Sequence, residues 1–197
     1  LICSPFNPVE IHPLIWFFNT MTVKILPGVM DQVTANAMNF WGLIFGLKPK
    51  LDDFLVLNLI SARNLSLIIC SLFYIILIIK FFKNYSSKTL LWMLATVSMV
   101  TFTFMTRMHE RYTFPALIPL LLLSHFDRRF RKYFIALSLT TIINVYSGWW
   151  TPNIPFLVNL LNNIIAVRIV SLINIIITLK LVLLSLSDNR YTIDNEN

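Results

Sequence analysis

One short stretch of the chain, TRMHERYTFP, gathers polar chemistry between two long apolar runs. Its ionisable side chains are Arg107, His109, Glu110, Arg111 and Tyr112. A guanidinium donates a planar fork of hydrogen bonds that matches a phosphate, a histidine exchanges a proton near neutral pH, and a tyrosine bonds to or stacks on a sugar. These residue types favour recognition of a lipid-linked phosphate. The alternative, a set of ion pairs that only fixes a helix end, stays open.

A second polar stretch, TANAMNFWGLIFG, lies earlier in the chain, at residues 34–46. Asn36 and Asn39 are three residues apart, so on a helix both amides would face the same way, and Trp41 follows them. The glycines after Trp41 allow a close approach of another segment. Amides and an indole are typical of sites for sugar hydroxyls and a pyranose face. The alternative is an interfacial helix anchored by Trp41 and capped by asparagines.

The carboxylates decide whether the chain could hold its own general base. A glycosyl transfer from a phosphate-linked donor needs a base for the acceptor hydroxyl and cations for the leaving phosphate. The candidate carboxylates that accompany the two polar stretches are Glu10, Asp31, Asp52, Asp53 and Glu110. None of them stands out as a base. Asp52 and Asp53 follow two lysines closely and are typical of a solvated loop. No zinc spacing, glycine-rich phosphate loop or nucleophile elbow is present.

The elements that must position these residues are membrane spans. The 197 residues are 57% hydrophobic and 13% charged, against about 25% charged in soluble proteins. We therefore expect an integral membrane protein and an all-α, polytopic helix bundle. Five spans are expected, at residues 59–82, 89–106, 112–126, 133–149 and 164–186.

The remaining segments complete the expected organisation. Prolines break the apolar clusters of residues 1–58, which predicts short interfacial helices there. Residues 59–186 form the transmembrane bundle, and residues 187–197 form a polar cytoplasmic tail. The net charge of +7 comes from short basic clusters between apolar runs, which indicates membrane flanks rather than nucleic-acid binding.

The basic clusters predict the orientation. The joint after the first span carries three lysines and the joint after the third carries Arg128, Arg129, Arg131 and Lys132, so both belong in the cytoplasm. The uncharged joint with Trp149 and Trp150 is typical of an outer interface. Alternation then places residues 1–58, the HERY residues and the tryptophan joint on the extracytosolic side of a plasma membrane. The third span covers only about 22 Å of a ~30 Å core, so the HERY charges should line a protein cavity.

These motifs resemble a known group of enzymes. MHERYTFPALIPLLLL, at residues 108–123, resembles the "MHERY, then Pro" stretch of the GT-C superfamily of polytopic glycosyltransferases. The resemblance is strongest to prokaryotic relatives of the GPI-anchor mannosyltransferases and of dolichol-linked glucosyltransferases. NAMNFWGL, at residues 36–43, is similar to their "NAYNLW" segment, and SPF, at residues 4–6, to a "PF" that closes an earlier span.

The resemblance implies a fold, a function and a site. Such enzymes pass a hexose, here expected to be mannose, from a polyprenyl-phosphate sugar to a lipid, glycan or protein acceptor on the extracytosolic face. His109, Glu110, Arg111 and Tyr112, with Arg107 beside them, would bind the donor phosphate. The outer wall of the cavity would come from Asn36, Asn39 and Trp41. No cofactor is implied, and a divalent cation stays open.

The chain departs from the family pattern in one feature that catalysis needs. The acidic residue that supplies the base in such enzymes has no counterpart here and is expected upstream of Leu1, so the chain resembles their C-terminal portion. The alternative is a non-enzymatic membrane protein, either half of a transporter or a lipid-binding accessory subunit. A transporter should show an inverted repeat, and the sequence has no visible internal repeat.

Overall fold

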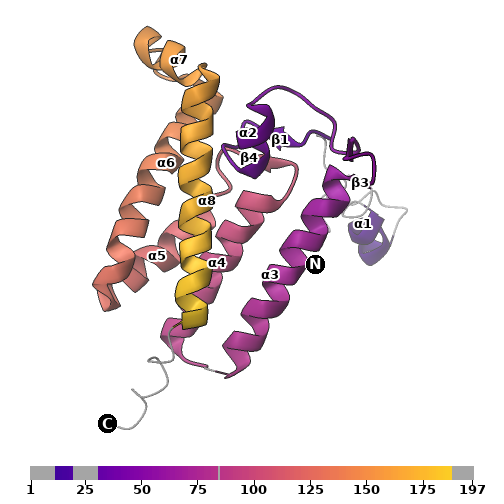
Figure 1. The fold of residues 1–197 in the computed structure, drawn as a ribbon. Coiled ribbons are helices and arrows are strands. Elements are labelled where there is room, and N and C mark those ends of the chain that lie inside the picture. Colours follow the sequence, from indigo (N-terminus) through magenta and orange to yellow (C-terminus); the bar gives the residue numbers. More distant parts are fainter. Residues whose placement is uncertain (1–11, 20–30, 84, 188–197) are drawn as a thin grey trace.

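The computed structural model describes residues 12–19, 31–83 and 85–187, and most of them are helical (Figure 1). The elements in chain order are α1 (Pro13–Asn19), β1 (Thr34–Ala35), α2 (Phe40–Phe45), β2 (Leu55–Val56), β3 (Ile60–Ser61), α3 (Ala62–Lys83), α4 (Ser87–Phe104), β4 (Met108–His109), α5 (Phe114–Phe126), the 3-10 helix η3 (Arg128–Phe130), α6 (Arg131–Trp149), α7 (Pro155–Leu161) and α8 (Ile164–Ser187). Each expected apolar run is thus a helix. SPF, Glu10 and the tail from residue 188 onward lie outside the described residues.

Three of the described helices are long and apolar enough to cross a membrane: α3, α4 and the 164–184 part of α8. This finding supports a membrane protein. With 13 residues, α5 spans only about 20 Å of a ~30 Å core. The apolar run of α6 is interrupted by buried hydroxyl and amide side chains such as Thr140, Thr141 and Asn144, which lower its hydropathy.

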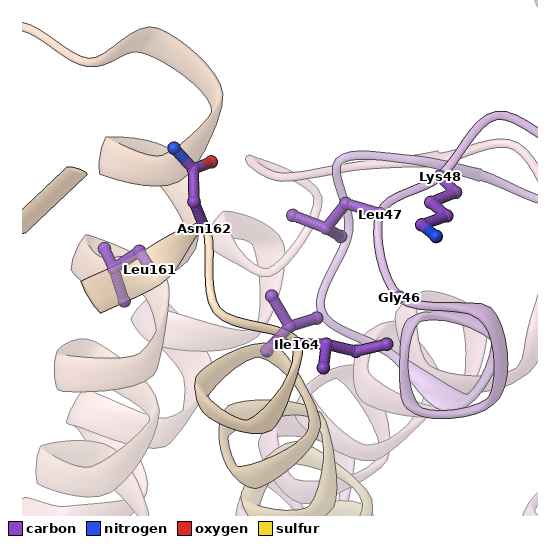
Figure 2. A pocket seen from close by; sticks show the side chains of 7 residues that line it. Gly46, Leu47, Lys48, Leu161, Asn162 and Ile164 are labelled. Carbon is purple, nitrogen blue, oxygen red and sulfur yellow. The ribbon is translucent and has the colours of Figure 1, made fainter. Parts of the chain in front are cut away.

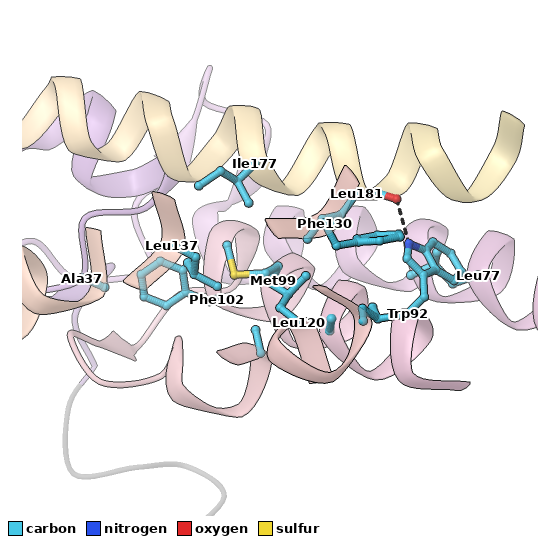
Figure 3. Close-up of a cluster of buried hydrophobic side chains, with 13 residues drawn as sticks. Ala37, Leu77, Trp92, Met99, Phe102, Leu120, Phe130, Leu137, Ile177 and Leu181 are labelled. Carbon is cyan, nitrogen blue, oxygen red and sulfur yellow. Dashed lines mark hydrogen bonds between the residues drawn. The ribbon is translucent and has the colours of Figure 1, made fainter. Parts of the chain in front are cut away.

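The core lies where α4, α5, α6 and α8 meet (Figure 3). Met99, Phe102 and Leu120 are fully buried there. Near one end of this core, the indole Nε1 of Trp92 donates a hydrogen bond of 3.1 Å to the carbonyl oxygen of Leu181, which joins α4 to α8. In contrast, α3 packs mainly on α4 and exposes apolar side chains such as Leu72, as a helix facing lipid does.

Short strands join the ends of the helices, which the expectation of an all-α fold did not include. Strand β1 pairs in parallel with β4, with Thr34 opposite Met108 and Ala35 opposite His109, and β2 pairs with β3 in antiparallel orientation. The β1–β4 pair therefore brings the two polar stretches of the sequence together. In Figure 1 it lies beside α2 at the end of the bundle where α7 also lies.

Candidate functional site

The HERY stretch is a short strand followed by turns and not a helix. It begins after Met105, which closes α4, and its first ordered element is β4. Arg107 has a positive φ of 63° and its backbone N–H points to the carbonyl oxygens of Gln32 and Val33, both at 3.2 Å. Backbone pairing with the 31–36 segment thus replaces helical hydrogen bonds. Arg107 and Arg111, which are four residues apart, therefore do not share a helical face.

Arg107 is held by a buried carboxylate. Its Nε and Nη2 atoms donate to the two oxygens of Asp52 at 2.7 and 3.2 Å, and the hydroxyl of Thr106 donates to the same carboxylate at 3.3 Å. The hydrogen bond from Asp52 raises the pKa of Arg107 above its ordinary value. The expectation that Asp52 belongs to a solvated loop was wrong, because its carboxylate is the buried partner of this arginine. Arg107 therefore fixes the loop and is a poor candidate for phosphate binding.

Glu110 is the centre of the remaining polar cluster. The residue is only 4% exposed, and three side chains approach its carboxylate. The Nδ1 atom of His109 lies 3.7 Å from Oε2, Nη1 of Arg111 lies 3.8 Å from Oε1, and the indole of Trp149 donates to Oε1 at 3.2 Å. Glu110 therefore contacts residues of its own motif and Trp149 at the end of α6.

Arg111 and Tyr112 lie on the outside of this cluster. The side chain of Arg111 is 51% exposed, and that of His109 is 25% exposed. The rings of His109 and Tyr112 meet edge to face with their centroids 5.3 Å apart. A cation, an imidazole and a phenol thus lie together beside a buried carboxylate.

Sequence reasoning missed two residues that build this cluster. Trp149 was assigned only to the membrane interface, and Asn144 was not singled out. The Nδ2 atom of Asn144 donates to the carbonyl oxygen of Glu110 at 2.9 Å, and its Oδ1 accepts the N–H of Met38 at 3.0 Å. Its position inside an apolar run was the available signal, since buried amides at membrane depth seldom lack a partner.

The 34–46 stretch has a structural role in most of its residues. Asn36 is exposed in a turn with a positive φ of 60°, whereas Asn39 is fully buried and its Oδ1 caps α2 by accepting the N–H groups of Trp41 and Gly42. The predicted common face of the two asparagines was wrong, whereas the cap that the alternative expected is confirmed for Asn39 alone. Trp41 is also buried, and its indole donates to the carbonyl oxygen of Phe104 at 3.0 Å.

Asn36 alone of these candidates comes close to the HERY residues through the backbone. It forms an isolated bridge with His109 directly after the β1–β4 pair. The close approach of another segment, expected of the glycines, is confirmed at Gly42, where an added Cβ would lie 3.3 Å from Oγ of Ser171 on α8.

An apolar groove leads away from the cluster along the outside of α5 and α6. Its volume is about 390 Å³, and its walls include Phe114, Ile142, Val145 and Trp149. Trp149 belongs to both features, because its ring lines the groove while its N–H binds Glu110. The far end of the groove reaches Ser138, near the middle of α6. In the described part of the chain, no three His, Cys, Asp or Glu side chains are grouped so that they could hold a metal ion.

Comparisons with protein-family models, with curated proteins and with solved structures found no match to this chain. The likeness of residues 36–43 and 108–123 to glycosyltransferase motifs therefore stays a prediction from the sequence. The geometry of the cluster and the groove has to support a function by itself.

Proposed function

We propose that this chain forms the donor-phosphate site of a GT-C-like membrane glycosyltransferase, which transfers a hexose, expected to be mannose, from a polyprenyl-phosphate sugar to an acceptor. The observation that carries the proposal is the exposed Arg111 beside His109 and above the buried Glu110, at one end of an apolar helix bundle.

The contacts of His109 and Arg111 with Glu110 are both long. At 3.7 and 3.8 Å they exceed hydrogen-bonding distance, so the carboxylate attracts the two side chains without using their donors. Arg111 retains the N–H groups that a phosphate needs, and a protonated His109 adds a second donor. Charge that develops on the leaving phosphate would be stabilised by groups already in place.

The groove along α5 and α6 suits the hydrocarbon chain of such a donor. From Trp149 to Ser138 it follows α6 for about 16 Å, at ~1.5 Å per residue. A phosphate at Arg111 and a chain in this groove would place the sugar near Trp149 and Tyr112, two aromatic rings suited to a pyranose face. In this proposal Glu110 is a positioning residue, because the indole of Trp149 and the side chains of His109 and Arg111 already surround it, and another acidic side chain supplies the base.

The proposal includes five crossings and an extracytosolic site. The joints rich in Lys and Arg follow α3 and α5, whereas the HERY loop follows α4 and the tryptophan joint follows α6. With alternating helices, the basic joints fall on one side and the cluster on the other. The short α5 then needs either a thinner bilayer or the HERY loop within the membrane boundary.

The test measures transfer of radiolabelled hexose from a polyprenyl-phosphate hexose by the complete protein. We expect Arg111→Ala to lower the rate at least about 100-fold, the loss typical of removing one preorganised donor, while membrane insertion is unchanged. The matched control is Arg63→Ala, another exposed arginine, at the start of α3.

Normal transfer by Arg111→Ala would contradict the assignment. Binding of the labelled donor without any transfer by the complete protein would favour the lipid-binding accessory alternative, for which the apolar groove is the specific observation. A vesicle assay for donor movement across the bilayer separates that role from transport.

A further inference from the structure

A second cavity lies apart from the HERY cluster, where the end of α2 meets the junction of α7 and α8 (Figure 2). Its volume is about 150 Å³. Leu161, Ile164 and Val167 provide an apolar floor, and Lys48 and Asn162 are the polar side chains of its lining. The chain can turn away from α2 here because Gly46 adopts a positive φ of 69°. The cavity is thus apolar within and polar at the rim.

The charged side chain in the lining of this cavity is a cation, Lys48. Lys48 has no ion-pair partner among the described residues, and Arg168, which lies just outside the lining, forms no salt bridge with a described residue either. Arg168 follows Ile164 by four residues on the same face of α8, and its Nε donates to the carbonyl oxygen of Leu43 at 3.2 Å. The sequence has no Asp or Glu in residues 36–51 or 128–187, the segments that build the cavity. No carboxylate of these segments would therefore repel an anionic ligand.

The position of the cavity along α8 indicates how deep the cavity lies in a membrane. The apolar stretch that is able to cross a membrane starts at Ile164, and its 21 residues extend for about 32 Å, close to the ~30 Å of a hydrocarbon core. The first turn of such a helix lies at the level of the lipid headgroups, where basic side chains reach phosphate groups. The cavity opens at that turn.

We propose that this cavity binds the phosphate of an anionic glycerophospholipid from the surrounding bilayer, with Lys48 and Arg168 as the cations and the first carbons of an acyl chain on the apolar floor. Its volume is well below the ~300–1,000 Å³ of sites for whole drug-sized ligands. A headgroup fragment fits this size better than a complete lipid-linked sugar. The inference does not depend on the glycosyltransferase proposal, because it involves none of the HERY residues.

The test is native mass spectrometry of the complete protein in detergent, titrated with dioleoylphosphatidylglycerol or with dioleoylphosphatidylcholine. We expect the anionic lipid to bind at least about fivefold more tightly, and we expect Lys48→Gln and Arg168→Gln each to lower its affinity about fivefold, the contribution of one basic residue near an anionic lipid. The control is Lys50→Gln, since the ammonium of Lys50 lies over the rings of Phe45 and Phe54 at 4.4 and 4.0 Å. That variant should bind as the wild type does.

Two further variants separate loss of the site from loss of the fold. Lys48→Arg keeps the charge and should retain the preference, whereas Ile164→Trp fills the cavity without changing the charge and should abolish it. Equal binding of the two lipids, or an equal loss in Lys50→Gln, would overturn the proposal. So would displacement of the lipid by millimolar inorganic phosphate, which would assign the site to free phosphate. Sugar transfer is not measured, so a failure here leaves the proposed function untouched.

Discussion

Arg107 and Arg111 stand four residues apart in one motif and have different surroundings. Arg107 is bound to a carboxylate 55 residues earlier in the sequence, whereas Arg111 extends half exposed beside Glu110. The sequence predicted phosphate binding for both, because nothing local identifies Asp52 as the partner of one of them. The residue types were therefore sufficient to locate the cluster. They did not show which arginine has a structural role and which is free to bind a ligand.

This division predicts that two similar substitutions differ greatly in their effect on stability. Arg107→Ala leaves the buried carboxylate of Asp52 without its cation, and we expect the free energy of unfolding to fall by about 3 kcal/mol. Arg111→Ala removes an exposed side chain and should change it by less than about 0.5 kcal/mol. Denaturant-induced unfolding of the complete protein in detergent measures both. A similar small change in the two variants would contradict a structural role for Arg107.

The helices are the elements that the sequence predicts best. Each of the five apolar runs became a helix, because long apolar segments in a membrane satisfy their backbone only by helical hydrogen bonds. Strands β1 and β4 have two residues each and pair across more than 70 positions, so no local pattern marks them. The sequence also did not show where α2 begins. Asn39 is the N-cap of this helix, so Asn36 lies outside it.

The groove along α5 and α6 gives a second prediction, which concerns these helices. Ile142→Trp places a larger ring in the groove, and we expect the KM for a polyprenyl-phosphate hexose to rise about tenfold with little change in kcat, because the hydrocarbon chain binds equally in the ground and transition states. Leu139→Trp is the control, since Leu139 is exposed on α6 and does not line the groove. An equal effect of both substitutions would mean that the groove holds no chain of the donor.

The arrangement of the whole molecule predicts which loops share a side of the membrane. In the complete protein with every cysteine, Cys3 and Cys70 included, changed to serine, single cysteines can replace Asn153, in the joint after α6, and Arg128, in the joint after α5. We expect a membrane-impermeant maleimide added outside intact cells to label Asn153→Cys and not Arg128→Cys. Tyr85→Cys, in the joint after α3, should behave as Arg128→Cys does. Labelling of Asn153→Cys and Arg128→Cys from the same side would show that α6 does not cross.

We propose that the HERY end of the bundle binds the phosphate and sugar of a lipid-linked donor. The most direct measurement is photocrosslinking of a radiolabelled polyprenyl-phosphate hexose to the complete protein, with benzoylphenylalanine in place of Tyr112 or in place of Phe126. Both side chains are exposed, at 40% and 57%, and they flank opposite ends of α5. We predict a crosslink from position 112 that Arg111→Ala removes, and none from position 126. Equal crosslinking from the two positions, or none from position 112, would contradict the account.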